Sequence, residues 1–436
     1  MKIEFYKETE FKDTEIGRIP KDWEVSKLKE VLLLLRNGLT GEQNKEEKGY
    51  PITRIETISE ERINPNKLGY ISQVSEKDLQ GYKLLEGDIL FSHINSLEHI
   101  GKTAIYEGVP DFLLHGMNLL LLRPNKNKVY PKYLLYFLRL SRKRKIFWAM
   151  AKKAVNQASI NQTELGKMKI VLPPLPEQQK IAEILSTVDE AIQKTNEVIA
   201  KTERLKKGLM QELLTKGIGH KEFKDTEIGK IPKEWEVIKL EDACLEITDG
   251  SHWSPKEVEK SEYRIATVAN LRETYIDINS CKFISEEDYI RLVNEGDIPR
   301  RGDILFSKDG TVGISFAFKQ DHYKIGLLSS VAIIRPKPQL LFSDFGAYTL
   351  KSPKVFQQII GLKTGTALRR ITLNNLKRVK IPLPSIEEQQ KIAEILSTVD
   401  KKLEIERNEK AKLERIKQGL MDLLLTGKVR VKLKET

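Results

Sequence analysis

The feature that most constrains this chain is a sequence repeated without a single change. EQQKIAEILSTVD occupies residues 177–189 and again residues 388–400, so the copies begin 211 positions apart in a chain of 436 residues. A second landmark precedes each copy, as FKDTEIGRIPKDWEV at 11–25 and FKDTEIGKIPKEWEV at 223–237. A repeat period near half the chain length indicates a tandem duplication. The chain is therefore expected to fold as two related units.

Each exact copy opens a pattern typical of a long helix. Apolar positions recur at alternating steps of four and three, which predicts a coiled-coil seam. In the first copy the seam comprises Ile181, Leu185, Val188, Ile192, Thr195, Ile199, Thr202, Leu209 and Leu213, with a lapse at Lys206. In the second it comprises Ile392, Leu396, Val399, Leu403, Leu413, Leu420 and Leu424, interrupted by Glu406 and Lys410. Each helix would have about 40 residues and span roughly 60 Å. Because neither helix can bury this stripe alone, we expect the two to pair antiparallel.

Local signals predict where these helices begin and end. Ser385 and Glu388 have the spacing of a capping box, which predicts a helix start near residue 386. Gly217 and Gly427 follow the end of the periodicity and are the expected helix ends.

Two further glycines, Gly208 and Gly419, lie at equivalent positions inside the predicted helices. A glycine there costs about 1 kcal/mol relative to alanine. They mark either a close helix crossing or partner dock, or a tolerated local fault.

Short apolar runs bounded by glycine, proline, asparagine and aspartate dominate the segments between the landmarks. GDILFS occurs at 87–92 and again at 302–307. This pattern predicts strands and turns of a mixed α/β (α+β) domain in each half. Elsewhere the halves differ, as in SHINSLEHIGKT at 92–103 and SKDGTVGIS at 307–315. Such divergence fits two recognition modules for different targets, and it fits ordinary drift after duplication equally well.

The landmarks predict a pseudo-twofold organisation, with two domains joined by the paired helices. A tryptophan beside a proline opens each domain, and Trp23 and Trp235 are expected to pack rather than to stack on a base. The expected segments are a first domain at 1–172, a long helix at 173–217, a second domain at 218–383, a second long helix at 384–427 and a basic tail at 428–436.

The charge balance favours a polyanionic partner. The formal net charge is +12 and the pI is about 9.2, although 62 residues are acidic. Nucleic acid is favoured over a membrane surface because no amphipathic terminal anchor is evident. A solvated basic surface without a partner is the alternative.

The two cysteines, Cys244 and Cys281, lack disulfide or metal-ligand spacing. No apolar run reaches 18 residues and the first residues are charged, so we expect a cytoplasmic protein without signal peptide or membrane span.

Both landmarks together resemble the conserved regions of the specificity subunit of type I restriction-modification systems. The resemblance rests on IPKDWEV or IPKEWEV opening a domain and LPxxxEQQKIAEIL opening a long helix, and it covers essentially the whole chain. It implies two target recognition domains, each reading one half of a bipartite site in double-stranded DNA. It also implies helices that act as a ruler and dock two methyltransferase subunits, which carry S-adenosylmethionine and methylate adenine, together with restriction/translocase subunits.

Motifs for catalysis are missing from the sequence. No Asn-Pro-Pro-aromatic loop for holding a flipped adenine occurs, and Ile63-Asn64-Pro65-Asn66 is the nearest approach. Gly101-Lys102-Thr103 ends like a phosphate-binding loop but has Ser96 in place of the leading glycine. Six histidines without clustering argue against a metal site. We therefore predict a non-catalytic recognition subunit without a cofactor or metal of its own.

Candidate DNA contacts are loops that combine glycine, small hydroxyls, amides and cations, because these groups suit phosphate contacts and base-edge readout. The loops at 152–159 and 363–370 occupy matching places, each followed by isoleucine, and resemble a Gly-Thr-x-Gln type loop of the family. The predicted contacts are Arg36, Asn37, Thr40, Lys152, Lys153, Asn156, Gln157 and Ser159 in the first half, and Ser251, His252, Lys308, Thr311, Lys363, Thr364, Thr366, Arg369 and Arg370 in the second.

Two other functions are compatible with parts of this pattern. One is a coiled-coil scaffold that binds no nucleic acid. The other is a recognition module serving an enzyme that holds methyltransferase and nuclease in a single chain.

Overall fold

The computed structural model describes residues 4–155, 157–362 and 370–432, which form two compact units. The first unit contains the residues up to Asn196 together with those from Glu409 onwards, and the second is Glu197–Asn408. Two long helices, α5 (Leu175–Lys216) and α10 (Ile386–Leu424), each contribute one part to each unit.

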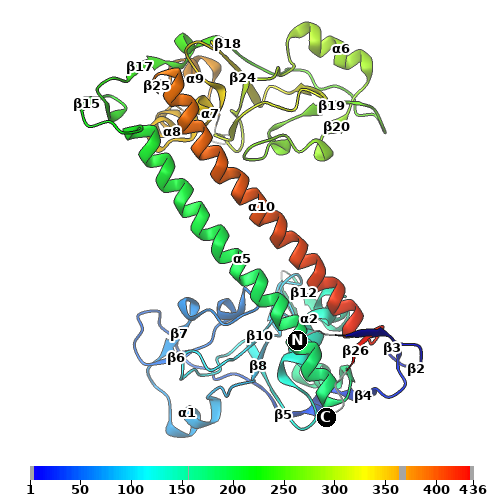
Figure 1. Cartoon of the computed structure of the whole chain (residues 1–436). Coiled ribbons are helices and arrows are strands. Elements are labelled where there is room, and N and C mark those ends of the chain that lie inside the picture. The colour runs from blue at the N-terminus through cyan, green and yellow to red at the C-terminus, as the bar shows by residue number, and fades with distance from the viewer. Residues whose placement is uncertain (1–3, 156, 363–369, 433–436) are drawn as a thin grey trace. The chain divides into compact units, whose positions relative to one another are not determined.

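The two long helices have 42 and 39 residues and run antiparallel (Figure 1). In the first unit Lys417 pairs with Asp189 at 2.6 Å. In the second unit Arg407 pairs with Glu203 at 2.8 Å, and Lys206 pairs with Asp400 at 2.5 Å. Residue numbers on one helix rise as those of its partner fall, which confirms the antiparallel pairing.

Burial along the helices follows the predicted seam most closely within the exact repeats. Ile181, Leu185, Ile392 and Leu396 are fully buried. Residues of the predicted seam between them are mostly half-buried, as are the polar interruptions in α10. The ion pairs described above cross the same region, so polar contacts there supplement a narrow apolar seam.

The helix starts agree with the sequence only in part. α10 begins at Ile386, and Ser385 Oγ accepts a hydrogen bond from the Glu388 backbone N–H at 3.3 Å. The Glu388 carboxylate does not complete the predicted capping box. It accepts hydrogen bonds from Trp235 Nε1 at 3.0 Å and from the Ile218 backbone N–H at 2.9 Å.

A four-stranded antiparallel sheet forms the centre of the first unit, in the order β10-β8-β11-β5. Its strands are β10 (Thr103–Ile105), β8 (Ile89–Ser92), β11 (Leu119–Pro124) and β5 (Leu32–Asn37). Along β11, Leu120 and Leu122 join one hydrophobic cluster while Leu119 and Leu121 join another. Successive side chains of a strand point to opposite faces. The unbroken leucine run is therefore explained by a sheet buried on both sides.

Smaller pieces surround this sheet in the first unit. The remaining strands are β1 (Phe5–Lys7), β2 (Phe11–Thr14), β3 (Gly17–Pro20), β4 (Glu24–Lys27), β6 (Tyr50–Ile52), β7 (Gly69–Ile71), β9 (Ile94–Asn95), β12 (Lys152–Ala154), β13 (Gln157–Ser159), β14 (Lys169–Leu172) and β26 (Val429–Val431). The short helices are α1 (Glu76–Tyr82), α2 (Pro131–Lys143), α3 (Ile146–Met150) and α4 (Gln162–Lys167).

The second unit repeats this plan. Its central sheet has the order β18-β24-β21-β22, and a three-stranded sheet has the order β20-β19-β23. The strands are β15 (Phe223–Thr226), β16 (Gly229–Pro232), β17 (Glu236–Lys239), β18 (Cys244–Asp249), β19 (Tyr263–Ala266), β20 (Lys282–Phe283), β21 (Ile304–Ser307), β22 (Ser315–Ala317), β23 (Lys324–Leu327), β24 (Val331–Pro336) and β25 (Lys380–Leu383). The helices are α6 (Glu286–Glu295), α7 (Ser343–Lys351), α8 (Pro353–Gly361) and α9 (Leu373–Lys377). The mixed α/β prediction is confirmed for both halves.

The C-terminal segment is not merely a basic tail. Val429–Val431 forms β26, which pairs antiparallel with β1 near the other end of the chain (Figure 1). Arg430 lies in this strand and bonds three carboxylates, those of Glu8, Asp22 and Glu177. β26 is thus an integral part of the first unit.

Both landmark tryptophans have the predicted packing role. Trp23 and Trp235 are 0% and 1% exposed. Trp23 Nε1 donates to Glu177 at 3.1 Å, and Trp235 Nε1 donates to its counterpart Glu388 at 3.0 Å. The two repeated motifs therefore contact each other in each unit. Gly427 adopts a φ of +70° beside Trp23, where an added Cβ would lie 2.3 Å from Pro20.

Both cysteines are buried, unpaired thiols, and burial raises the pKa of Cys244 to about 12 and that of Cys281 to about 11. Within the described ranges, every helix is too short or too polar to cross a membrane.

Candidate nucleic-acid interface

One end of the central sheet gathers most of the predicted contact segments of the first unit. β5 and β8 both pair antiparallel with β11, so they are parallel to each other. Asn37 ends β5 opposite Leu120, and Ser92 ends β8 opposite Leu119. The loops that follow β5 and β8 therefore leave the sheet at the same end, beside the start of β11.

A hairpin joins this end of the sheet. β12 pairs with β13, and β13 pairs with β9, which follows β8 directly. Lys152 and Lys153 in β12 and Gln157 in β13 are exposed. Val155 at the hairpin tip is 93% exposed. The hairpin thus presents cations, an amide and an apolar tip to solvent.

The central sheet of the second unit brings the equivalent strand ends together. Asp249 ends β18 opposite Ala332, and Ser307 ends β21 opposite Val331. Arg370 forms a bridge with Asp309, just after β21.

Backbone bonds show that the residues just after the two predicted loops correspond. Ile371 N–H donates to the Lys308 carbonyl, as Ile160 N–H donates to the His93 carbonyl in the first unit. The residues that follow 152–159 and 363–370 therefore occupy equivalent places, while 363–369 lie outside the described residues.

The polar pair at this sheet end differs between the units. In the second unit the Lys308 amine lies 3.0 Å from the Asp249 carboxylate, and both side chains are about nine-tenths buried. The corresponding positions in the first unit are His93 and Asn37. His93 is 7% exposed, and burial lowers its pKa to about 4, so it is neutral near pH 7. An ion pair in one unit thus stands where the other has two neutral polar groups.

Most described residues that the sequence singled out are accessible at this end. The exposed ones are Asn37, Thr40, Lys152, Lys153 and Gln157 in the first unit and His252, Thr311 and Arg370 in the second, while Ser159 is half-buried. Asn156, Lys363, Thr364, Thr366 and Arg369 lie outside the described residues.

Three of the predicted contact residues are less accessible than the sequence suggested. Arg36 is held within its domain because its guanidinium lies 3.7 Å from the centre of the Tyr82 ring and donates to the Gly81 carbonyl at 2.6 Å. Ser251 is 3% exposed, and Lys308 is 9% exposed.

The two burials have different causes. The backbone at Gly250 approaches that of Leu327 so closely that an added Cβ would lie 2.3 Å from the Leu327 carbonyl oxygen. The next residue, Ser251, donates its N–H to the same carbonyl and is covered by this contact. Lys308 is drawn inward by Asp249, whose place in the register only the fold reveals.

Sequence reasoning missed several polar groups at this sheet end. Asp249 lies within a loop that the sequence singled out but was not chosen as a contact residue. His93 and Asn95 were not singled out at all, although each lies beside a predicted contact loop. The only signal available was their position next to the repeated GDILFS run, where the two halves begin to differ.

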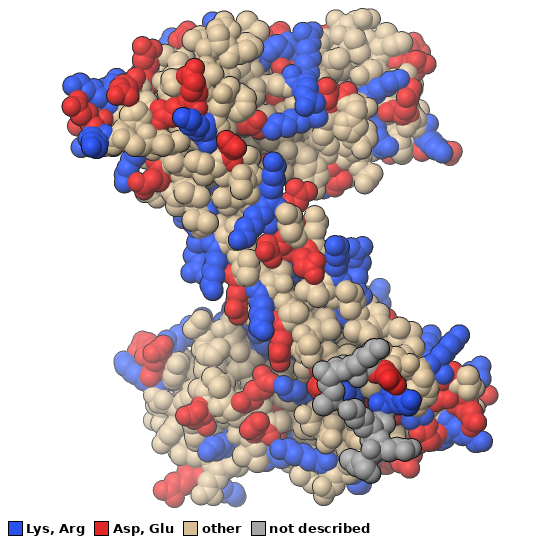
Figure 2. Space-filling view, viewed as in Figure 1, with Lys and Arg blue, Asp and Glu red and all other residues tan. Residues whose placement is uncertain are grey.

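Charges of both signs are present on the face of the molecule that Figure 2 shows. Figure 2 shows basic and acidic side chains interspersed over the face in view. Among the described residues no group of three or more His, Cys, Asp and Glu is arranged to hold a metal ion.

A comparison with known protein families shows which family the chain belongs to. The model described as "Type I restriction modification DNA specificity domain" matches residues 20–204 and 232–415. The chain belongs to this family. Membership confirms the resemblance carried by the repeats, and it gives the chain a role in DNA sequence recognition within a restriction-modification system.

Individual members of the specificity-domain family match over their full length. A protein of Methanocaldococcus jannaschii, provisionally assigned as the MjaX type I restriction enzyme specificity subunit, is 46% identical over 433 residues, which cover 99% of each chain. The MjaVIII specificity subunit of the same organism is 31% identical, over 99% of this chain and 98% of that one. The crystal structure of an S subunit from M. genitalium has the same fold, with a TM-score of 0.59 over 92% of this chain and 96% of that one, at 14% identity.

Proposed function

We propose that this chain gives a type I restriction-modification complex its DNA specificity, with each unit contacting one half of a bipartite double-stranded site. The observation that carries the proposal is that the same sheet end in both units presents exposed loops of different sequence. A shared scaffold with different contact groups is what two readers of different half-sites require.

The contact groups divide by chemistry. Lys152 and Lys153 are suited to phosphate contacts, which position a protein on DNA and make its affinity depend on salt. Asn37 and Gln157 carry amides that can bond base edges in pairs. In the second unit the exposed candidates are His252, Thr311 and Arg370.

The long helices have a separate proposed role. Because α5 and α10 each run without interruption from one unit into the other, their length would set the distance between the half-sites. Their outer faces would dock two methyltransferase subunits, which supply the cofactor and methylate adenine, and restriction/translocase subunits would join that assembly. The chain itself would recognise DNA without catalysis and would work in the cytoplasm.

A salt titration of DNA affinity tests the first-unit interface. Replacing both Lys152 and Lys153 by alanine should flatten the plot of log affinity against log salt by about two, since each phosphate contact contributes about 0.9 to the slope. The control is Lys126→Ala, which removes an exposed lysine just beyond the opposite end of β11. It should leave the slope unchanged.

The same assay can reject the assignment. Equal slopes for the double variant and the wild-type chain would place the DNA elsewhere. A loss of the same size in the Lys126 control would show only a general charge effect.

A further inference from the structure

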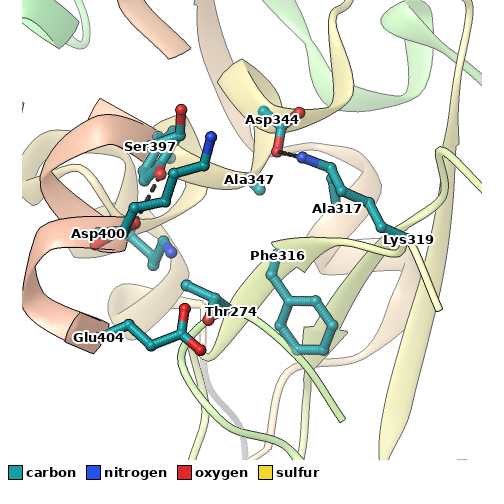
Figure 3. Close-up of a pocket in the computed structure, with 12 residues that line it drawn as sticks. Thr274, Phe316, Ala317, Lys319, Asp344, Ala347, Ser397, Asp400 and Glu404 are labelled. Atoms are coloured by element: carbon teal, nitrogen blue, oxygen red, sulfur yellow. Dashed lines mark hydrogen bonds and ion pairs between the residues drawn. The ribbon is translucent and has the colours of Figure 1, made fainter. Parts of the chain in front are cut away.

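A cavity of about 130 Å³ opens in the second unit, outside the candidate DNA interface. α7, β22 and α10 supply most of its walls, and Thr274 closes one side (Figure 3). Its lining includes Lys351, Tyr348 and Asp400. We call it the Lys351 pocket.

The duplicated first unit shows what fills the equivalent place. There Tyr136 donates to Asp189 at 2.8 Å, as Tyr348 donates to Asp400 at 2.6 Å in the second unit. Arg139 takes the place of Lys351, and its guanidinium lies 3.5 Å from Asp189 and 3.6 Å from the Glu61 carboxylate. The first unit thus closes its own network with two carboxylates around one cation.

The second unit has no carboxylate at the position of Glu61, and the carboxylate of the neighbouring Glu273 lies 3.9 Å from Lys206 and 3.6 Å from Arg407 instead. In the matching loops the Asn64 and Asp277 backbone N–H groups bond the Thr57 and Asn270 carbonyls, and this register puts Thr274 where Glu61 stands. Ala347 likewise replaces the larger Leu135 on the matching helix. The shorter side chains leave space, and the cation loses a partner.

The Lys351 amine is left without an ion-pair partner among the described residues. It lies 4.9 Å from the centre of the Tyr348 ring. Asp400 is already paired with Lys206 at 2.5 Å, and Asp344 is paired with Lys319 at 2.8 Å. Burial, and next the Lys206 cation, lower the pKa of Lys351 to about 8.

The remaining charges on the wall come from α10. Lys401 and Glu404 line the pocket and are exposed to solvent, so they offset each other at its rim. Lys351 is thus a cation of the lining that no ion pair among the described residues offsets, and a negatively charged group would neutralise it.

We propose that the Lys351 pocket binds a carboxylate side chain of a protein partner docked on α10, at the place that Glu61 fills in the first unit. This inference rests on the proposed function, because the partner is a methyltransferase subunit. A protein is favoured over a free anion because Ser397, Lys401 and Ile405 succeed one another at four-residue steps along α10, and Ile405 is 66% exposed. An apolar contact thus adjoins the charged one.

Binding of the purified methyltransferase subunit to the full chain tests the inference. Lys351→Met should weaken binding roughly tenfold or more, because a buried charge-assisted contact is lost. Thr274→Glu should weaken it similarly while leaving the fold intact, because the introduced carboxylate occupies the pocket from within. Lys351→Arg should bind within about threefold of wild type. Lys354→Met, at an exposed lysine of α8 outside the pocket, is the matched control and should bind normally.

Titration of the Lys351 amine by NMR, after isotopic dimethylation of lysines, provides a readout that does not need the partner. Thr274→Glu should raise the pKa of Lys351 in the free chain. Acetate should raise it only weakly, whereas strong binding of acetate that competes with the subunit would show a site for free carboxylates and overturn the protein-partner assignment.

The outcomes separate the two proposals. Normal subunit binding by both Lys351→Met and Thr274→Glu would refute the pocket while leaving the proposed function intact. If the wild-type chain bound no methyltransferase subunit, the docking part of the proposed function would fail, and the pocket proposal with it.

Discussion

Arg430 is the residue whose loss should be felt most strongly in the first unit. Its guanidinium donates five hydrogen bonds: two to Glu177 at 3.0 and 2.7 Å, two to Asp22 at 2.7 and 2.8 Å, and one to Glu8 at 2.9 Å. This network holds β26 against β1 and against the start of α5. Arg430→Met would remove every one of these donors while keeping much of the side-chain volume.

The expected cost follows from burial. The Arg430 side chain is 11% exposed and that of Glu177 is 2% exposed, so the substitution leaves a buried carboxylate with only the Trp23 indole as a side-chain donor. Breaking a buried pair by removing one partner costs about 3–5 kcal/mol. Asp22 is 50% exposed, so its share should be small.

Hydrogen exchange measures this loss locally. The amides of β1 and β26 should exchange on the order of a thousandfold faster in Arg430→Met, while those of β17 and β25 in the second unit should be unchanged. Adding Glu177→Gln to Arg430→Met should recover part of the lost stability, because the buried carboxylate left without its arginine is then replaced by a neutral amide. The control Arg18→Met removes an exposed pair at 3.8 Å and should cost under about 0.5 kcal/mol. A loss below about 1 kcal/mol, or no recovery in the double variant, would refute this account of the network.

Three further predictions concern the helices and acid stability. Gly208→Ala and Gly419→Ala should each stabilise the isolated chain by about 1 kcal/mol in urea unfolding, because both glycines are exposed and an added Cβ meets nothing within 4 Å; destabilisation would show a hidden close contact. Burial lowers the pKa values of His93 and His115 in the folded chain to about 4, whereas in the unfolded chain they are near 6.5. The unfolded chain therefore binds these protons first, and the folded state loses stability as the pH falls from about 6.5 towards 4. The first unit should lose up to about 3 kcal/mol per histidine over that range, and glutamine at both positions should flatten the profile if titration is the cause. Inserting four residues after Thr195 should lengthen α5 by about 6 Å, and mapping of methylated adenines should then show a spacer longer by at most about two base pairs with both half-sites unchanged; an unchanged spacer with full activity would contradict the ruler.

The parts of the fold that sequence predicted are those with local, repeated signals. The helices follow from a sustained seam, and Ile386 begins α10 next to the capping serine. By contrast, β26 has only three residues, and its partner β1 lies more than 400 residues away in the sequence. So short a strand gives no periodic pattern, and its pairing depends on contacts that sequence spacing does not encode.

The candidate interface was predicted at the level of loops more than of single residues. Within each unit, most of the described loops that were selected lie at one end of the central sheet. Loop composition predicts this because polar residues and glycine are typical of solvent-exposed loops. The reduced accessibility of Arg36, Ser251 and Lys308 comes from tertiary partners, namely an aromatic ring, a close backbone and a distant carboxylate. A lysine in a polar loop looks exposed until the strand register brings Asp249 beside it.

The central claim is that each unit reads its own half-site, and a graft tests it most directly. Residues 24–172 would be replaced by 236–383, because these segments begin and end at equivalent strand pairs, Glu24 with Leu172 and Glu236 with Leu383. Methylated adenines would then be mapped genome-wide in cells that contain the graft and its partner subunits. The account predicts methylation at inverted repeats of the second half-site, with the original spacer. Continued methylation at the original asymmetric site would contradict it.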